Sequence, residues 1–232
     1  MKLIITGATG LVGSAVVRRA LQSKQFTTIV AVSRQPLKVE DGLDQTKLKN
    51  VIVKDYGDYP EDVKKELAGA DGCIWTVAIT PMRSKALPWD EVKRVCQSNT
   101  LTGMEALHEA GVSKPFRFLY MSGVAAPRDQ TKRPLFMADY GLMRGQTENM
   151  VLEYAAKNGW EAAVAKPGLI IGDSLLHTVL GGFLRVTNVL PSLLLTEIAA
   201  GVLQQVANGF EKEPLMSKDL QRIGRASLED KD

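Results

Sequence analysis

The sequence has few of the side chains that form disulfide frameworks or metal centres. Among 232 residues there are two cysteines and two histidines. Cys73 and Cys96 belong to no paired-cysteine motif of the kind that zinc sites use. We therefore predict no bound metal, no disulfide scaffold and two reduced thiols, as in an intracellular protein.

The sequence also lacks a strong excess of charge of one sign. The 29 lysines and arginines oppose 26 aspartates and glutamates, which leaves a formal charge of +3. This balance does not favour nucleic acid as a partner, since proteins that bind nucleic acid concentrate basic residues. Hydrophobic residues make up 45% and charged residues 24%, which are ordinary values for a globular domain and exclude disordered and fibrous classes.

Long uninterrupted apolar runs are missing as well. The longest apolar region, Leu175 to Leu195, is interrupted by glycine, proline, histidine and arginine, whereas a membrane-spanning helix needs about 20 apolar residues. At the N-terminus, the apolar run Leu3 to Ile5 is too short for the core of a signal peptide. We expect no membrane partner and a cytoplasmic location.

Short apolar runs alternate along the chain with helical patterns, and the runs are continuously apolar, as in strands of a sheet covered on both faces. Predicted strands are Leu3 to Ile5, Thr28 to Val32, Val51 to Val53, Gly72 to Val77, Phe116 to Met121 and Ala162 to Ala165. Predicted helices are Leu11 to Ser23, Glu61 to Leu67, Trp89 to Glu109 and Tyr140 to Lys157. Such alternation implies βαβ crossovers and a parallel sheet. The predicted fold class is α/β, a doubly wound Rossmann sheet in one domain over residues 1–232.

After Lys166 the alternation weakens. The segment Pro167 to Leu195 is apolar and resembles a loop, a helical pattern returns over Thr196 to Asn208, and the polar end Ser227 to Asp232 is expected to fray. We expect a small C-terminal lid formed mainly by residues 167–195.

The lid is expected to complete a substrate site together with Thr80 to Leu87 and Ala125 to Met137. Its apolar side chains suit an apolar or aromatic small molecule. The alternative is that they only pack on the sheet. His177 lies in this segment, and its side chain either only fills space or contacts a ligand.

A glycine-rich segment, Thr6-Gly7-Ala8-Thr9-Gly10-Leu11-Val12-Gly13, follows the first predicted strand and opens the first predicted helix. Glycines at these positions permit a tight turn, close approach to a pyrophosphate and close helix packing. Free N–H groups and the helix dipole then favour phosphate. The segment therefore predicts dinucleotide binding, the alternative being a turn with a purely structural role. The expected contacts are Gly7, Thr9, Gly10, Leu11, Val12 and Gly13.

With this loop, the sequence resembles the short-chain dehydrogenase/reductase superfamily, in its atypical and extended, NmrA-like or epimerase-like branch. The resemblance covers nearly the whole chain. Residues Ser98 to Leu107 resemble the central helix, and Tyr120-Met121-Ser122-Gly123 the end of the catalytic strand. Residues Tyr140 to Glu148 resemble the Tyr-xxx-Lys helix, and Lys166-Pro167-Gly168 the loop beside the nicotinamide.

The resemblance implies further cofactor contacts. Asp55, with Tyr56, corresponds to the acidic residue that contacts the adenine amino group, and Asp58 is a competing candidate. The other implied cofactor contacts are Thr76, Val77, Ala78, Asn99, Tyr140, Arg144, Pro167 and Gly168.

The end of the second predicted strand indicates which dinucleotide is bound. An acidic residue that would hold the ribose hydroxyls is absent there, and Ser33 and Arg34 stand in its place. A guanidinium at this point suits a 2′-phosphate. We therefore predict NADP(H), the alternative being that Arg34 is a solvated loop residue.

In the family a tyrosine transfers the proton, a lysine four residues later lowers its pKa, and a serine hydroxyl binds substrate. Tyr140 matches the tyrosine, but Arg144 replaces the lysine. Arginine can stabilise a tyrosinate and bond ribose hydroxyls, yet it cannot pass a proton onward. Ser122 is the candidate serine, although the family spacing points to Gly123. The alternative for Tyr140 is a helix tyrosine without a chemical role.

These features predict an NADPH-dependent reductase of a small apolar carbonyl compound, acting as a monomer or homodimer. One alternative is a non-redox isomerase, epimerase or cyclase that uses Tyr140 as acid and base. Another is a non-enzymatic regulator that senses NADP.

Overall fold

The computed structural model describes residues 1–39, 42–172 and 192–229. Its centre is a sheet of seven parallel strands in the order β3-β2-β1-β4-β5-β6-β9. The strands are β1 (Lys2–Thr6), β2 (Thr28–Ser33), β3 (Leu48–Ile52), β4 (Gly72–Trp75), β5 (Arg117–Met121), β6 (Glu161–Lys166) and β9 (Leu215–Met216). The strand order reverses at β1 and β4, and this reversal forms a crevice at the carboxyl ends of the strands, where open α/β sheets bind ligands.

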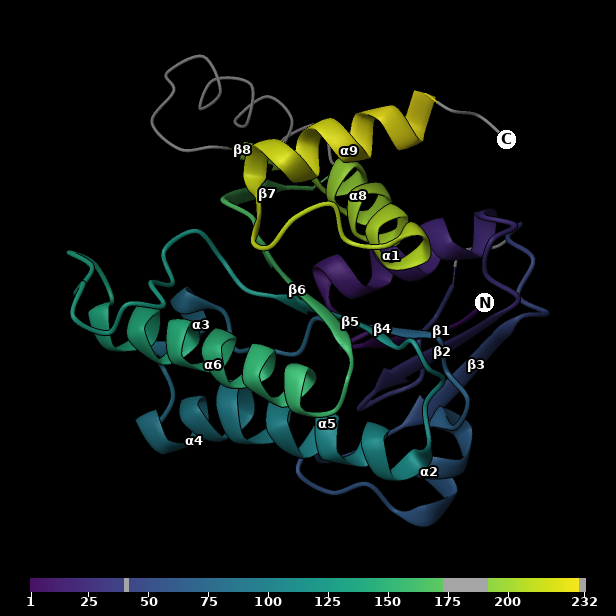
Figure 1. Cartoon of the computed structure of the whole chain (residues 1–232), viewed down its shortest axis with the longest axis horizontal. Coiled ribbons are helices and arrows are strands. Elements are labelled where there is room, and N and C mark those ends of the chain that lie inside the picture. Colours follow the sequence, from purple (N-terminus) through teal and green to yellow (C-terminus); the bar gives the residue numbers. More distant parts are fainter. Residues whose placement is uncertain (40–41, 173–191, 230–232) are drawn as a thin grey trace.

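Helices cover both faces of the sheet, as the continuous apolar strands predict. Figure 1 shows α1, α8 and α9 on one face and α2, α4, α5 and α6 on the other. The helices are α1 (Leu11–Gln22), α2 (Glu61–Leu67), α3 (Pro81–Ser84), α4 (Trp89–Lys93), η1 (Arg94–Ser98), α5 (Asn99–Ala110), α6 (Ala138–Lys157), α8 (Leu195–Asn208) and α9 (Ser217–Glu229). The predicted doubly wound Rossmann class is confirmed.

Successive residues of each central strand enter different cores. Leu3 and Ile5 pack toward α1 and α8, whereas Ile4 packs with Trp75 toward α5, and all four are buried. This follows from the period of two in a strand, which sends neighbouring side chains to opposite faces. β3 lies at the edge, and three of its five residues are exposed.

The structure differs from the predicted elements after residue 89. The single helix predicted over Trp89 to Glu109 is divided by η1, a π-helical turn over Arg94–Ser98. Within the segment predicted to be a loop, β7 (Leu169–Ile171) pairs in parallel with β8 (Ser192–Leu194). Residues 173–191, including His177, lie outside the described residues, so the predicted lid stays a prediction.

The prediction of a frayed end from Ser227 is wrong for residues 227–229, which belong to α9. Polar residues dominate this helix, but Leu220 and Ile223 are buried against the core. Close contact with α8 is possible because a Cβ at Gly224 would lie 2.0 Å from the carbonyl oxygen of Glu197. Packing on α8 therefore orders a segment whose composition alone indicates a tail.

The glycine-rich turn holds α1 tightly against the end of β1. A Cβ at Gly13 would lie 2.2 Å from the carbonyl oxygen of Gly7, a distance that no side chain tolerates. At Gly10 the same oxygen would be 3.1 Å away, which is crowded but not closed. The space for a Cβ is therefore closed at Gly13 and only restricted at Gly10.

We expect Gly13→Ala to lower the free energy of unfolding by roughly 1–3 kcal/mol, because overpacking forces the helix away from the turn. Alanine is the better helix former, so helix propensity works in the opposite direction. Chemical denaturation of this variant, of Gly10→Ala and of the wild type measures the difference. A Gly13→Ala protein as stable as the wild type would contradict the close approach.

Candidate functional site

The turn between β1 and α1 presents backbone N–H groups to the crevice. Gly7 has a φ of +68°, a left-handed conformation that favours glycine. Gly10 precedes α1, and no side chain caps the helix there. The first N–H groups of a helix have no acceptor within it, so those of Leu11, Val12 and Gly13 are available to an anion.

Two of the predicted cofactor residues, Tyr56 and Thr76, form hydrogen bonds with the backbone of this turn and of the strands beside it. The Tyr56 hydroxyl donates to the carbonyl oxygen of Val32 at 3.0 Å and accepts from the Gly7 N–H at 3.1 Å. Burial raises the pKa of Tyr56 to about 12. The Thr76 hydroxyl donates to the Thr6 carbonyl at 2.6 Å. Both side chains tie the turn to neighbouring strands, and their contact with a cofactor stays a prediction.

Arg34 and Asp55 follow two adjacent strands and are both exposed. The Ser33 hydroxyl donates to the carbonyl of Gln35 at 2.5 Å, so it is already engaged within this turn, whereas Arg34 is exposed. The Asp55 carboxylate accepts from the Gly57 N–H at 2.9 Å and from Asn99 at 3.4 Å. The Gly57 N–H is the main cause of a lowered Asp55 pKa.

Tyr140 and Arg144 lie one turn apart on α6, at the carboxyl ends of β4 and β5. The half-buried Tyr140 hydroxyl donates to the carbonyl oxygen of Ile79 at 2.8 Å. Burial raises the Tyr140 pKa, and the positive charge of Arg144 opposes that shift. This pair is therefore close in space, as the sequence predicts from its spacing of four.

Arg144 is only 4% exposed, and one of the two terminal nitrogens of its guanidinium has no hydrogen-bond partner among the described residues. Nη2 donates to the Met121 carbonyl at 2.5 Å, and Cζ lies 4.9 Å from the centroid of the Tyr120 ring. Nη1 is the atom without a partner, and the Cys96 thiol lies near the same guanidinium. Because an unpaired buried donor is costly, this atom fits a site completed by a ligand acceptor such as a ribose hydroxyl.

Ser122 is turned toward α6. Its hydroxyl donates to Glu148 Oε1 at 2.6 Å. Beside it, a Cβ at Gly123 would meet only the Pro167 carbonyl oxygen, at 3.8 Å. Position 123 thus has space for the hydroxyl that the family pattern expects, while the Ser122 hydroxyl already has an acceptor.

Glu148 belongs to a buried ion network that our sequence reasoning missed. Its carboxylate has no exposed surface, and both of its oxygens accept from Lys166 Nζ at 2.8 Å. Arg128 Nε donates to Oε2 at 2.8 Å and links the network to Glu213. A sequence signal exists, since Glu148 follows Tyr140 and Arg144 at the next interval of four on the same helix face.

The remaining predicted contacts lie around the same crevice. Val77 and Ala78 follow β4, and Asn99 is buried at the start of α5. The Pro167 carbonyl accepts from the Val124 N–H at 3.1 Å, and the Gly168 N–H donates to the Ser217 hydroxyl at 2.7 Å. The predicted set therefore gathers at one end of the sheet.

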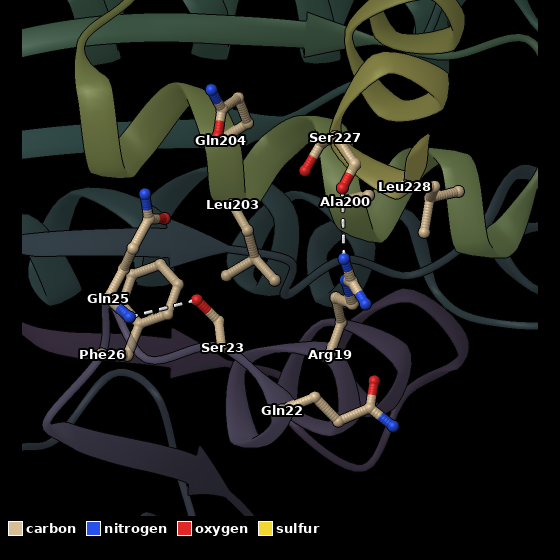
Figure 2. A pocket seen from close by; sticks show the side chains of 10 residues that line it. All are labelled: Arg19, Gln22, Ser23, Gln25, Phe26, Ala200, Leu203, Gln204, Ser227 and Leu228. Carbon is tan, nitrogen blue, oxygen red and sulfur yellow. Dashed lines mark hydrogen bonds between the residues drawn. The ribbon is translucent and has the colours of Figure 1, made fainter. Parts of the chain in front are cut away.

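A separate cavity of about 620 Å³ lies at the other end of α1 (Figure 2). Arg19, Gln22 and Ser23 contribute from α1 and its end, and Ala200, Leu203 and Gln204 from α8. Arg19 donates across it to the Ser227 carbonyl at 3.2 Å. The 12 residues of α1 extend about 18 Å at 1.5 Å each, which separates this cavity from the glycine-rich turn.

Within residues 1–39, 42–172 and 192–229, no helix has the length and hydrophobicity required to cross a lipid bilayer. No group of three or more His, Cys, Asp or Glu side chains within them is arranged to hold a metal ion.

The geometry defines a dinucleotide-binding α/β protein, and comparison with known proteins agrees. A family model described as NAD(P)H-binding matches residues 7–169. The chain belongs to this NAD(P)H-binding family. Its fold is that of the extended short-chain dehydrogenase/reductase superfamily, as the resemblance predicts.

Curated relatives are similar at low identity. Protein FMP52, mitochondrial, from Debaryomyces hansenii is 26% identical over 174 residues, which are 74% of this chain and 68% of the relative. Dihydroflavonol 4-reductase from Hordeum vulgare is 28% identical over 196 residues, 75% of this chain and 54% of the relative. A leucinostatins biosynthesis cluster protein T from Purpureocillium lilacinum is 38% identical over 76 residues, 33% of this chain and only 27% of the relative.

Solved structures show the same fold. A double mutant of a dTDP-glucose 4,6-dehydratase from Streptomyces venezuelae, with NAD bound, has a TM-score of 0.70 and 17% identity. It aligns with 100% of this chain and 82% of its own. Vestitone reductase from alfalfa (Medicago sativa) has a TM-score of 0.68 and 16% identity, covering 93% of this chain and 77% of its own.

We expect Glu148→Gln to lower the free energy of unfolding by about 3–5 kcal/mol, because Lys166 would keep its buried charge without an anionic partner. Thermal and chemical denaturation measure this change. The control is Glu66→Gln, which breaks the exposed pair with Lys49 at 2.9 Å and should cost under about 1 kcal/mol. Equal stabilities of the two variants would argue against the buried network.

Proposed function

We propose that the protein is an NADPH-dependent reductase of a small, apolar carbonyl compound. The observation that carries this proposal is the presence of two groups one turn apart on α6: the Tyr140 hydroxyl, and Nη1 of buried Arg144, which has no partner among the described residues. One group can supply a proton and the other can hold a ribose hydroxyl. Both lie on α6, at the same end of the sheet as the glycine-rich turn.

Each residue has a defined task in such a reaction. NADPH, when bound, supplies a hydride to the carbonyl carbon of the substrate. The N–H groups at the start of α1 bind the pyrophosphate, and Arg144 donates to the ribose. Tyr140 exchanges its bond to the Ile79 carbonyl for one to the substrate oxygen and gives that oxygen its proton. The products are an alcohol and NADP⁺.

After the transfer, Arg144 stabilises the tyrosinate through its positive charge. Arginine does not release protons at physiological pH, so Tyr140 must regain its proton from water rather than through residue 144. In this proposal, residues 167–195 form the lid over an apolar substrate, and the protein acts in the cytoplasm as a monomer or homodimer.

The absence of a relay also favours a second candidate, a non-redox isomerase or epimerase. In such a reaction Tyr140 would take a proton from the substrate and return it within the same turnover. The inability of Arg144 to relay a proton would then not slow turnover, since no proton has to be replaced from solvent. Net oxidation of NADPH distinguishes the reductase from this candidate.

Tyr140→Phe should lower turnover by roughly 10²-fold or more, because it removes the general acid, while NADPH affinity stays nearly unchanged. NADPH oxidation is followed with a panel of ketones, quinones and flavins. Tyr154→Phe is the matched control, because it removes a hydroxyl from the same helix away from the site. Full activity in the Tyr140 variant would exclude the tyrosine mechanism.

Arg34→Ala should weaken NADPH binding by roughly 10- to 100-fold, the equivalent of one or two lost charge-assisted hydrogen bonds. NADH binding should hardly change, because NADH carries no 2′-phosphate. Titration calorimetry of both dinucleotides measures the effect, with Lys38→Ala as the control for a nearby exposed cation. If wild-type protein binds both equally at moderate salt, Arg34 does not select the cofactor.

A further inference from the structure

The π-helical turn η1 places Arg94 between two carboxylates. Its Nε and Nη2 donate to Glu91 at 2.8 and 2.9 Å, and its Nη1 donates to both oxygens of Asp55 at 2.9 Å. The three side chains keep 39–52% of their surface exposed. Exposed pairs of this kind contribute at most about 1 kcal/mol to stability. The cluster is therefore open to a ligand and free to rearrange.

Arg34 lies next to this cluster. Ser33 and Ile52 are paired across β2 and β3, and the Val53 N–H donates to the Ser33 carbonyl at 3.0 Å. Arg34 and Asp55 therefore leave adjacent strand ends. Arg34 makes no hydrogen bond or ion pair with a described residue, so its guanidinium is available.

Glu91 lies within the electrostatic reach of both arginines. Its pKa is lowered chiefly by the hydrogen bond from Arg94, and the charge of Arg34 contributes as well. Arg94 thus contacts the Glu91 carboxylate directly, and the charge of Arg34 reaches it from the end of β2. Two cations around a single exchangeable anion are the arrangement expected at a phosphate site.

We propose that Arg94 and Arg34 together bind the 2′-phosphate of the dinucleotide and that Glu91 is a built-in competitor for the same guanidinium groups. This inference rests on the proposed NADP(H) function and adds a second specificity-determining arginine and a residue that limits affinity. Asp55 holds Nη1 of Arg94 throughout. The opposite edge, Nε and Nη2, exchanges the Glu91 carboxylate for the phosphate.

The exchange is favourable on charge and geometry. A phosphate carries more negative charge than a carboxylate, and the planar fork of arginine bonds to either in a bidentate manner. Glu91 is exposed, so its side chain can turn into solvent without leaving a buried group unpaired. Removing its charge should therefore strengthen phosphate binding, which a purely structural ion pair would not do.

The test uses titration calorimetry with two fragments, adenosine 2′,5′-bisphosphate (2′,5′-ADP) and 5′-AMP, which differ only in the 2′-phosphate. Arg94→Ala should weaken binding of 2′,5′-ADP about 10-fold, since one charge-assisted bond of about 1.4 kcal/mol is a factor of 10. Glu91→Gln should strengthen it by roughly 3-fold or more, as expected for a removed competing charge. Both variants should bind 5′-AMP within about twofold of the wild type.

Lys93→Ala is the matched control, because it removes an equal charge from the neighbouring exposed position of α4. It should leave both fragments unchanged. Equal losses for both fragments in Arg94→Ala would overturn the inference and assign Arg94 to positioning Asp55. Unchanged 2′,5′-ADP affinity in Glu91→Gln would overturn the role of Glu91.

The result also separates this inference from the proposed function. If wild-type protein does not prefer 2′,5′-ADP to 5′-AMP, both the proposed NADP(H) selection and the proposed roles of Arg94 and Glu91 are wrong. If the wild type prefers 2′,5′-ADP and Arg34→Ala removes that preference while Arg94→Ala retains it, NADP(H) selection stands. Only the roles proposed for Arg94 and Glu91 are then wrong.

Discussion

The contact between the start of α1 and the turn after β1 determines where the site can form. Gly13 lies against the Gly7 carbonyl so closely that a Cβ would be 2.2 Å from its oxygen. Tyr56 then connects the same turn to β2, and Thr76, which follows β4, donates to the Thr6 carbonyl where the turn begins. As a result, the free N–H groups of α1 are held at the reversal of strand order, where a pyrophosphate can reach them.

α6 contributes charged groups with two different functions at successive intervals of four residues. Glu148 is fully neutralised by Lys166 and Arg128, so it links α6 to β6 and to the loop after β5. Arg144 is equally inaccessible to solvent but keeps one donor unpartnered. A satisfied buried ion network stabilises structure, whereas an unsatisfied buried donor indicates a ligand. This contrast is what assigns Arg144, rather than Glu148, to cofactor binding in our proposal.

The sequence allowed prediction of the features that depend on local pattern. The parallel sheet, its covering helices, the glycine-rich turn and the closeness of Tyr140 to Arg144 follow from periodicity and spacing. The Glu148 network and the Arg94–Asp55 pair join residues 18 to 85 positions apart, and no local pattern encodes such partners. α9 was missed because a polar composition masked two core residues, Leu220 and Ile223.

We propose that Arg144 takes the place of the family lysine by holding the nicotinamide ribose through Nη1. A crystal structure of the complex with NADP⁺ would locate the ribose relative to this atom. We predict the pyrophosphate at the N–H groups of Leu11, Val12 and Gly13 and a ribose hydroxyl about 3 Å from Arg144 Nη1. A complex in which Nη1 stays unpartnered while the ribose is bound by other residues would contradict the account.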